Sequence, residues 1–480
     1  MKSRDCLRFF MVSLILIAAA IPAASQTPAD DSREKLLERV EQLEMQLNQI
    51  KSEVAVLRET LAAKPAPPLN VAATPAAPAT HPPGPPREIA GKKEAGIPLG
   101  PWKATPYGTL YFNAFGNSGG SNNTDLPTFA ATGAGNASAS VRQTRLGLRL
   151  AGPELSGAAV RGVVEADFFG GFPPSGVGEN FALVRLRLAY GELEWKHARL
   201  VVGQDWVFFA PNNPLSIANA AIPQLTSAGN LWARLPQVRL DLRGGSRAKW
   251  LWQFGVLAPA TGDFPGTSSA FLLQPGAGAR SRMPYFESRA AGIFEDWLGL
   301  GQPATFGASV HYGRSRTATT AGNRDLDSAG AAFDWNFPIV PHVTLLGEAF
   351  FGRNLAGFQG AIFQGINSDF AIRTPTGLVA GGPRAIGTRG GWAQVQFVPP
   401  NLNKLTLYGS FGLDNPRKED LVSLAAHDWR LRNLAFSFGI LHKLIPQFTW
   451  GIEFRRLETD YLLSHRTNDK HVNAGVAVSF

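Results

Sequence analysis

The chain has 480 residues, a high glycine count of 51 and a charged fraction of 17%, which is below that of ordinary soluble domains. A mean hydropathy of −0.06 excludes a bundle of membrane helices. The net charge of +9 leaves nucleic acid, anionic surfaces and anionic small molecules as candidate partners. With a single cysteine, Cys6, a disulfide framework is excluded.

The N-terminus has the pattern of a secretory signal peptide over residues 1–25. Lys2, Arg4 and Arg8 precede an apolar run at 9–21, and small residues follow at 23–25. The apolar run is shorter than the roughly 20 residues that a membrane-spanning helix needs. Cleavage would remove Cys6, and export excludes nucleic acid as a partner.

Residues 26–62 are predicted to form a coiled coil. Their apolar side chains are separated alternately by four and three residues, which is the a/d seam of a heptad repeat. The seam consists of Leu36, Val40, Leu43, Leu47, Ile50, Val54, Leu57 and Leu61. An amphipathic helix packed on the following domain is the alternative, but a strict period of 3.5 drifts off a single globular face. The seam predicts a homo-oligomer without choosing between a dimer and a trimer.

Residues 63–103 are dominated by proline and alanine. Such chains stay extended, close to polyproline II, because they have little apolar mass to bury. We interpret this segment as a spacer without a fold of its own.

From residue 104 to 480 the sequence alternates between apolar and polar residues, which is the period of a β-strand. The segment 238–243 is an example, with Val238, Leu240 and Leu242 opposite Arg239, Asp241 and Arg243. About sixteen such strands can be counted. Short connections alternate with long ones, which lie near 117–139, 207–233, 259–284, 354–385 and 414–430.

Short turns on one side and long loops on the other are typical of outer-membrane barrels, whereas a soluble sandwich has no reason to maintain them. We therefore predict an all-β fold, a transmembrane antiparallel β-barrel of about 16 strands, preceded by an N-terminal periplasmic coiled-coil helix. The chain ends on Phe480, in phase with the apolar face, which resembles the C-terminal assembly signal of such barrels. Sixteen strands close to a diameter that leaves an aqueous lumen.

If the apolar face contacts lipid, the opposite face lines the pore. The charged residues predicted there are Arg145, Arg149, Arg185, Arg187, Arg239, Arg243, Glu165, Asp167 and Asp241. The arginine fork suits carboxylate and phosphate, so a wall of arginines would concentrate anions. The alternative is that the arginines only brace the lumen through pairs with carboxylates. The third external loop, 207–233, is nearly uncharged and is predicted to fold inward and narrow the pore; an external flap is the alternative.

Signals for an enzyme are weak. Residues 116–120 match G-x-S-x-G, but a polar loop follows where a nucleophile elbow needs a helix. The histidines lack ligand spacing, and no phosphate-binding G-x-x-x-x-G-K-[ST] is present. We expect no enzyme, no metal site and no cofactor.

Three segments, 145–171, 185–195 and 200–209, contain the motifs RLGLRLAGPELSGAAVRGVVEADFFGG, RLRLAYGELEW and LVVGQDWVFF. They resemble the DcaP-like porins of dicarboxylate uptake. The resemblance implies a sixteen-stranded trimer with an N-terminal coiled coil in the periplasm that takes up small anionic solutes. Phosphate-selective porins share similar hairpins and basic pore walls, and no family contact residue is carried over to this chain.

The leading hypothesis is a homotrimeric porin in the outer membrane of a Gram-negative bacterium. It would give passive diffusion to small hydrophilic, carboxylate-type anions, with outer-membrane lipid around the barrel. A phosphate-type porin is one alternative. Another is a tether that binds peptidoglycan through the N-terminal region and whose pore activity is secondary.

Overall fold

The computed structural model describes residues 96–172, 182–246, 248–259, 268–269, 272–273, 275–319 and 322–480. The predicted signal peptide, the predicted coiled coil and residues 63–95 of the predicted linker lie outside the described residues. The first described segment contains β1 (Ile97–Leu99), which pairs with the start of the first long strand.

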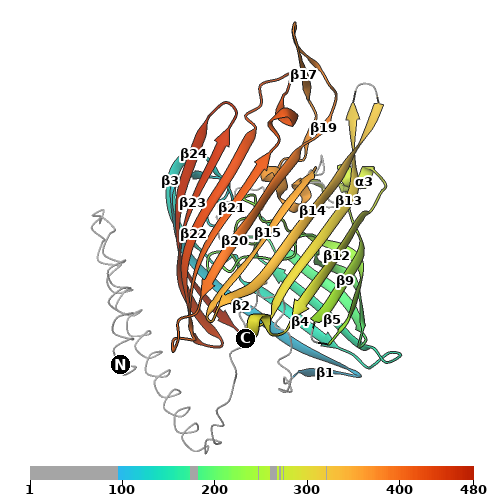
Figure 1. Ribbon diagram of the computed structural model, residues 1–480, viewed down its shortest axis with the longest axis vertical. Coiled ribbons are helices and arrows are strands. Elements are labelled where there is room, and N and C mark those ends of the chain that lie inside the picture. The colour runs from blue at the N-terminus through green and yellow to red at the C-terminus, as the bar shows by residue number, and fades with distance from the viewer. Residues whose placement is uncertain are drawn as a thin grey trace, which may run out of the picture. The chain divides into compact units, whose positions relative to one another are not determined.

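Sixteen antiparallel strands form a closed barrel (Figure 1), as the alternating pattern predicts. They are β2 (Trp102–Ser121), β3 with β4 (Ala130–Ser140 and Arg145–Ala151), β5 (Ala159–Asp167), β6 (Arg185–Glu194), β7 (Ala198–Trp206), β8 (Arg234–Gly245), β9 (Ala248–Leu257), β12 (Tyr285–Phe294), β13 (Ala304–Thr319), β14 (Gly322–Val340), β15 (Val343–Arg353), β20 (Gly387–Phe397), β21 (Leu405–Pro416), β22 (Arg430–Ile445), β23 (Phe448–Tyr461) and β24 (Arg466–Ser479). Both β3 and β4 pair with β2, so they are two parts of one strand. The barrel closes where β2 pairs with β24, from Thr109 opposite Ser479 to Asn117 opposite His471.

Small elements occupy the connections. They are β10 (Ser268–Ser269), β11 (Leu272–Leu273), α3 (Ala277–Arg280), η1 (Trp297–Gly299), η2 (Ala356–Phe358), α4 (Gly360–Phe363), β16 (Ile366–Asn367), β17 (Ala371–Thr374), β18 (Gly377–Ala380), β19 (Arg384–Ala385) and η3 (Lys418–Leu421). None of the helices in the described part of the chain is both long and apolar enough to cross a membrane.

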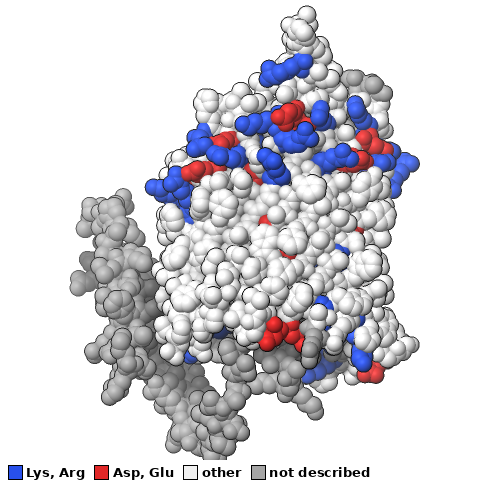
Figure 2. All heavy atoms as spheres, in the orientation of Figure 1, with Lys and Arg blue, Asp and Glu red and all other residues white. Residues whose placement is uncertain are grey.

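The two faces of the sheet differ as the sequence predicts. On β8, Val238 and Leu240 are exposed on the outside, whereas Arg239 and Asp241 are buried on the inside. On β9 the large outward side chains are those of Trp250, Trp252, Phe254 and Val256. The outside therefore has a broad uncharged band, with charged residues above and below it (Figure 2). An apolar outside with a polar inside is the pattern of a barrel in lipid.

One predicted long connection, 117–139, is shorter in the structure. Strand β2 continues to Ser121 and pairs with β3, which begins at Ala130, so only residues 122–129 connect them. The sequence of β3 consists of alanine, glycine, serine, threonine and asparagine, which have weak β-propensity. Pairing with β2 makes this segment a strand, and a single sequence does not show that pairing.

Candidate functional site in the barrel lumen

The nine residues predicted to line the pore all lie in the inward-facing phase of β4, β5, β6 and β8. Six of them are buried: Arg145, Glu165, Asp167, Arg187, Arg239 and Asp241. Arg149, Arg185 and Arg243 are partly exposed. We call the inward charged residues of β4–β8 the basic wall; besides the nine it contains Arg161, Glu192, Glu194, Arg199 and Asp205.

The upper part of the basic wall is a network of ion pairs. Arg187 contacts Glu165 and Asp167, each at 2.8 Å, and Arg185 contacts Asp167 at 2.6 Å. The Arg145 guanidinium lies 3.7 Å from Glu165. The sequence left two alternatives for these arginines, a wall that attracts anions and a network that braces the lumen. The structure combines features of both, because the arginines face the lumen and also pair with carboxylates.

The lower part repeats this arrangement on β6, β7 and β8. Arg239 lies 3.1 Å from both Asp205 and Asp241, and Arg243 lies 2.6 Å from Glu194. Arg199 pairs with Glu192 and lies 3.6 Å from Asp241. Sequence reasoning missed Arg199, although Glu194 lies directly opposite it in the β6–β7 pair and Glu192 lies diagonally opposite, which is a recognisable cross-strand signal.

In three arginine–carboxylate pairs of the basic wall, the arginine side chain is more exposed to solvent than its carboxylate partner. The side chain of Arg185 is 27% exposed and that of its partner Asp167 is 0% exposed. The values are 23% against 9% for Arg199 and Glu192, and 41% against 22% for Arg243 and Glu194. In these three pairs the guanidinium is therefore the group that a solute in the lumen meets.

Residues 207–233, here called the inner loop, connect β7 to β8 and fold into the barrel, as predicted. The backbone N–H groups of Phe208 and Phe209 both donate to Glu287 on β12 at 3.2 Å. The N–H of Asn212 donates to Glu348 on β15. The two ends of the loop lie side by side, because the N–H of Val207 donates to the carbonyl of Ala233 at 3.1 Å.

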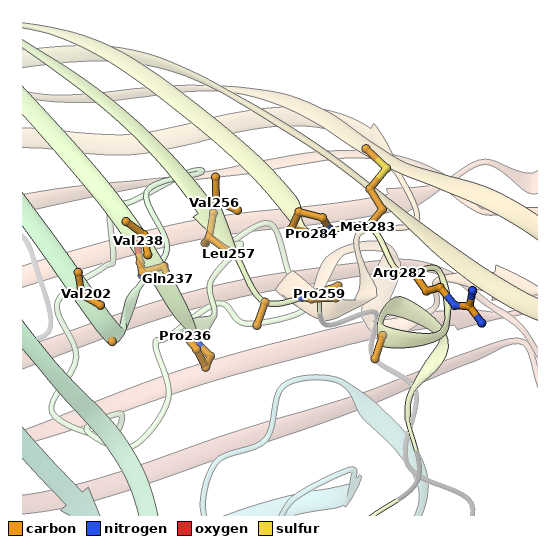
Figure 3. A pocket seen from close by; sticks show the side chains of 13 residues that line it. Val202, Pro236, Gln237, Val238, Val256, Leu257, Pro259, Arg282, Met283 and Pro284 are labelled. Atoms are coloured by element: carbon orange, nitrogen blue, oxygen red, sulfur yellow. The ribbon is translucent and has the colours of Figure 1, made fainter.

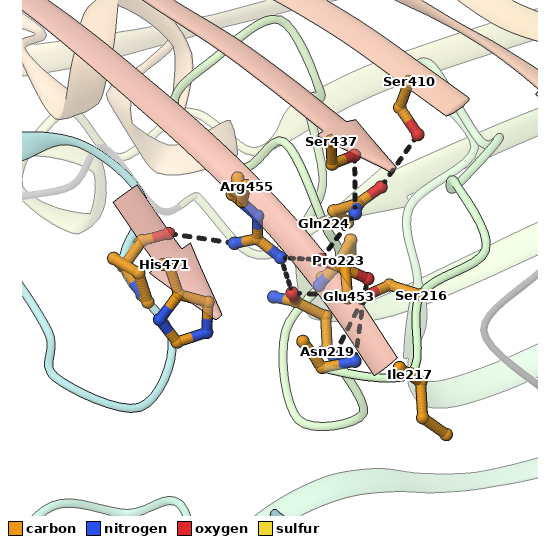
Figure 4. Close-up of polar contacts among 12 residues, drawn as sticks. Ser216, Ile217, Asn219, Pro223, Gln224, Ser410, Ser437, Glu453, Arg455 and His471 are labelled. Carbon is orange, nitrogen blue, oxygen red and sulfur yellow. Dashed lines mark hydrogen bonds and ion pairs between the residues drawn. The ribbon is translucent and has the colours of Figure 1, made fainter. Parts of the chain in front are cut away.

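The central anchor of the inner loop is Glu453 on β23 (Figure 4). Ser216 Oγ and Gln224 Nε2 both donate to this carboxylate, the latter at 2.8 Å. Arg455 pairs with it at 2.6 Å, and Tyr408 donates to it at 2.7 Å. Glu453 is fully buried, so its charge is balanced by these donors and not by solvent.

The tip of the inner loop reaches the basic wall. The carbonyl of Ala221 accepts hydrogen bonds from Arg185, Arg187 and Arg234, each at 2.9 Å. Gln143, between β3 and β4, accepts from the N–H groups of Ala220 and Ala221. The loop therefore spans from the far strands to the arginines, and the space beside this contact is the candidate constriction.

Arg234 was missed by sequence reasoning. It begins β8 and lies out of phase with Arg239. Its guanidinium stacks over the rings of Trp206 and Trp232, at 4.6 and 5.1 Å from their centroids. The signal available in the sequence was an arginine that directly follows a tryptophan-containing uncharged loop.

The carboxylates of the opposite side are covered by loops. Besides Glu287, Glu348 and Glu453, Asp414 on β21 accepts from the N–H of Ile362 in α4 at 3.0 Å and from Thr388 Oγ1. All four are nearly completely buried. We call them the far-wall carboxylates.

Changing Glu453 should destabilise the barrel, because this carboxylate is the partner of the buried Arg455. Its replacement by alanine would leave Arg455 buried without its carboxylate, which typically costs about 3–5 kcal/mol. We expect a large drop in the free energy of unfolding, measured by guanidinium titration of barrels in lipid vesicles. Glu453→Gln keeps an acceptor oxygen and should lose less. An alanine variant as stable as the wild type would show that Glu453 does not anchor the loop.

A hollow of about 680 Å³ lies on the outside of the barrel, between β7, β8, β9 and the segment after α3 (Figure 3). Val202, Val238 and Val256 line it, and all three are exposed on the outward face. It faces the surroundings of the barrel and not the lumen, so it is not part of a solute path. Within the described residues no group of histidine, cysteine, aspartate or glutamate side chains is arranged to hold a metal ion.

Comparison with protein-family models and with curated proteins gave no match. Among solved structures, the outer membrane channel DcaP of Acinetobacter baumannii matches with a TM-score of 0.60 and 16% identity, over 81% of this chain and 100% of that chain. An anion-selective porin from Comamonas acidovorans matches with a TM-score of 0.47 and 12% identity, over 79% and 100%. OmpT of Vibrio cholerae matches with a TM-score of 0.47 and 9% identity, over 80% and 100%. The barrel thus has the fold of a DcaP-like porin, which confirms the resemblance at the level of the fold.

Proposed function

We propose that this protein is a porin of the Gram-negative outer membrane through which small hydrophilic anions diffuse passively. The closed barrel with an apolar outside supports membrane insertion, because it leaves no unpaired strand edge in lipid. Sixteen strands enclose a lumen wide enough for water. The inner loop narrows that lumen from within.

The preference for anions rests on one observation, the difference in exposure between the two signs of charge. On the basic wall, Arg185, Arg199 and Arg243 are more exposed than the carboxylates that they pair with. The far-wall carboxylates are buried beneath hydrogen-bond donors from loops and neighbouring strands. A solute beside the inner loop therefore meets mainly positive charge. At physiological ionic strength the screening length is about 8 Å, so this charge acts across a narrow constriction.

The proposed solutes carry carboxylates. A guanidinium binds carboxylate or phosphate through two parallel hydrogen bonds, so the arginines suit both groups. The resemblance to dicarboxylate-uptake porins favours carboxylates. Block of the chloride current by a four-carbon dicarboxylate at lower concentrations than inorganic phosphate would support this choice, and the reverse order would favour the phosphate-type porin.

The direct test is the reversal potential of single channels in a planar bilayer with a potassium chloride gradient. We expect a potential of the sign that chloride selectivity gives, and a larger one at low salt because screening is weaker there. A reversal potential of the opposite sign would refute the anion preference while leaving the channel itself intact.

We further propose that three copies associate through their barrels. On the outside of β2, the small residues Ala114 and Gly116 follow the large exposed side chains Leu110 and Phe112, so another barrel could approach this part of the strand closely. Full-length protein should sediment as a trimer in detergent, and deletion of residues 26–62 should leave a trimeric barrel. A stable monomer of the full-length chain in analytical ultracentrifugation would contradict this proposal.

A further inference from the structure

A row of basic residues lies on the outside of the barrel from β13 to β24, at the ends of these strands that carry the long loops (Figure 2). We call this row the outer cationic belt. It consists of Arg314, Arg316, Arg353, Arg389, Arg417, Arg432, Arg456, Arg466 and Lys470. Each is exposed or partly exposed. Arg417 lies just after β21, and the others lie in the outward phase of their strands, so none of them belongs to the basic wall.

The belt has fewer carboxylates than cations. Arg417 and Arg456 each pair with a glutamate of their own, Glu419 and Glu458. Asp325 is shared by Arg314 and Arg316, at 4.0 and 2.6 Å. Asp460 is shared by Arg432 and Arg466, at 2.9 and 2.7 Å. A carboxylate shared by two guanidinium groups leaves a positive excess on the pair.

Asp327 is shared in the same way, between Arg314 and Arg353. Arg389 and Lys470 make no ion pair with any other described residue. The belt therefore offers free and half-neutralised cations to a ligand that approaches from outside.

Large apolar side chains accompany these cations. Phe351 is opposite Arg389 in the β15–β20 pair and is 66% exposed. Phe436 is opposite Arg456 in the β22–β23 pair and is also exposed. A ligand that fits this surface must therefore carry an anionic group next to an apolar part.

The belt does not continue around the barrel. Among the described outward-phase positions of β4–β9 and β12, Arg234 is the one charged residue, and its side chain contacts the inner loop at Ala221. The corresponding positions there carry side chains such as Leu186, Val202, Val238 and Phe286. Within the described barrel strands, exposed outward cations are therefore confined to β13–β24.

We propose that the outer cationic belt binds the phosphate groups of a phosphorylated glycolipid in the outer leaflet, with the acyl chains against the apolar residues of β13–β24. This inference rests on the proposed placement in the outer membrane, because the long-loop side then faces the leaflet that carries the glycolipid. Arginine matches phosphate through its planar fork, and lysine adds a point charge. Binding at the boundary would hold the barrel at a fixed depth in the membrane.

The test compares the full-length protein with two triple variants in detergent micelles that contain diphosphorylated lipid A, or the same lipid without its phosphates. The belt variant is Arg389→Gln, Arg456→Gln and Lys470→Gln. The control removes three charges at the short-turn end, by Lys249→Gln, Lys404→Gln and Lys443→Gln. Lipid copies retained per barrel are counted by native mass spectrometry.

We expect the wild type and the control to retain several-fold more of the phosphorylated lipid than of the phosphate-free lipid, and the belt variant to lose this difference. Equal retention by the belt variant and the wild type, or an equal fall in the control, would overturn the proposal. Release of the lipid by millimolar inorganic phosphate would also overturn it, since the belt would then be a site for the free ion.

Folding and channel function provide independent checks. Heat-modifiable mobility on gels reports the folded barrel, and the variant Arg389→Lys, which keeps the charge, should retain the lipid. Because the belt lies outside the lumen, the belt variant should have the wild-type reversal potential. A failure of anion selectivity would therefore leave the lipid result unchanged, and the two proposals can fail separately.

Discussion

Replacing residues 211–230 of the inner loop by a short glycine-serine linker is expected to raise the single-channel conductance several-fold. These residues cross the lumen from Glu348 to the tip contact at Ala221. The hairpin can close without them, because Val207 and Ala233 are already hydrogen-bonded and Trp206 pairs with Arg234. The deletion keeps Phe208, Phe209 and Leu231, which belong to the apolar cluster beneath the loop.

The same deletion should weaken anion preference. Glu348 and Glu453 would lose the donors that the loop supplies and would face water in the widened lumen. An exposed carboxylate attracts cations, so the reversal potential should move toward zero or change sign. Conductance and selectivity would thus change together, which a loop that only obstructs the pore would not produce.

The matched control is a deletion of the β17–β18 hairpin tip at 373–378. This hairpin is largely exposed and lies beyond the ends of the barrel strands (Figure 1). Its removal should leave both conductance and reversal potential unchanged. If the inner-loop deletion folds and conducts like the wild type, the constriction must lie elsewhere in the lumen.

Much of the fold could be predicted from the sequence, because a barrel wall imposes a strict period of two. Val238, Arg239 and Leu240 alternate between outside and inside just as their residue types require. A shift of one residue in strand pairing would exchange the inward and outward side chains, so the alternation of apolar and polar residues determines the pairing strongly. One exception is β3, whose small residues carry no alternation of hydrophobicity. The other is β6, where a bulge between Leu186 and Leu188 shifts the alternation and turns Leu188 inward.

The site was predictable only in part. The inward phase of Arg145 and Arg187 follows from alternation, but their pairing with Glu165 depends on which strands are neighbours. The path of the inner loop depends on contacts far apart in the chain, such as Gln224 with Glu453, which no local pattern encodes. The absence of charge in 207–233 was the one local signal, since a loop buried in the lumen must avoid unpaired charges.

Removing the exposed arginines of the basic wall is expected to shift the channel from anion toward cation preference. The variant Arg185→Gln with Arg243→Gln takes away two partly exposed guanidinium groups and leaves Asp167 and Glu194 with one fewer partner each. Asp167 retains Arg187, and Glu194 retains Arg161, so the barrel should still fold. The reversal potential in a salt gradient measures the shift, and low salt should enlarge it because screening is then weaker.

A second variant, in which the partner carboxylates are also neutralised, tests whether the arginines act through their charge or only by holding the barrel wall in place. Adding Asp167→Asn and Glu194→Gln to the two arginine changes removes both members of each pair, so the net charge of the lumen returns to that of the wild type. If the exposed guanidinium groups themselves set selectivity, this quadruple variant should behave like the double variant, because the carboxylates that it also removes are the less exposed members of their pairs. Recovery of the wild-type anion preference would instead show that the net charge of the lumen sets selectivity. If the arginines act only by bracing the wall, the double variant should keep the wild-type permeability ratio, because Arg187 and Arg161 still hold the carboxylates in place. That outcome would withdraw the anionic substrate from the proposal and leave an unselective pore.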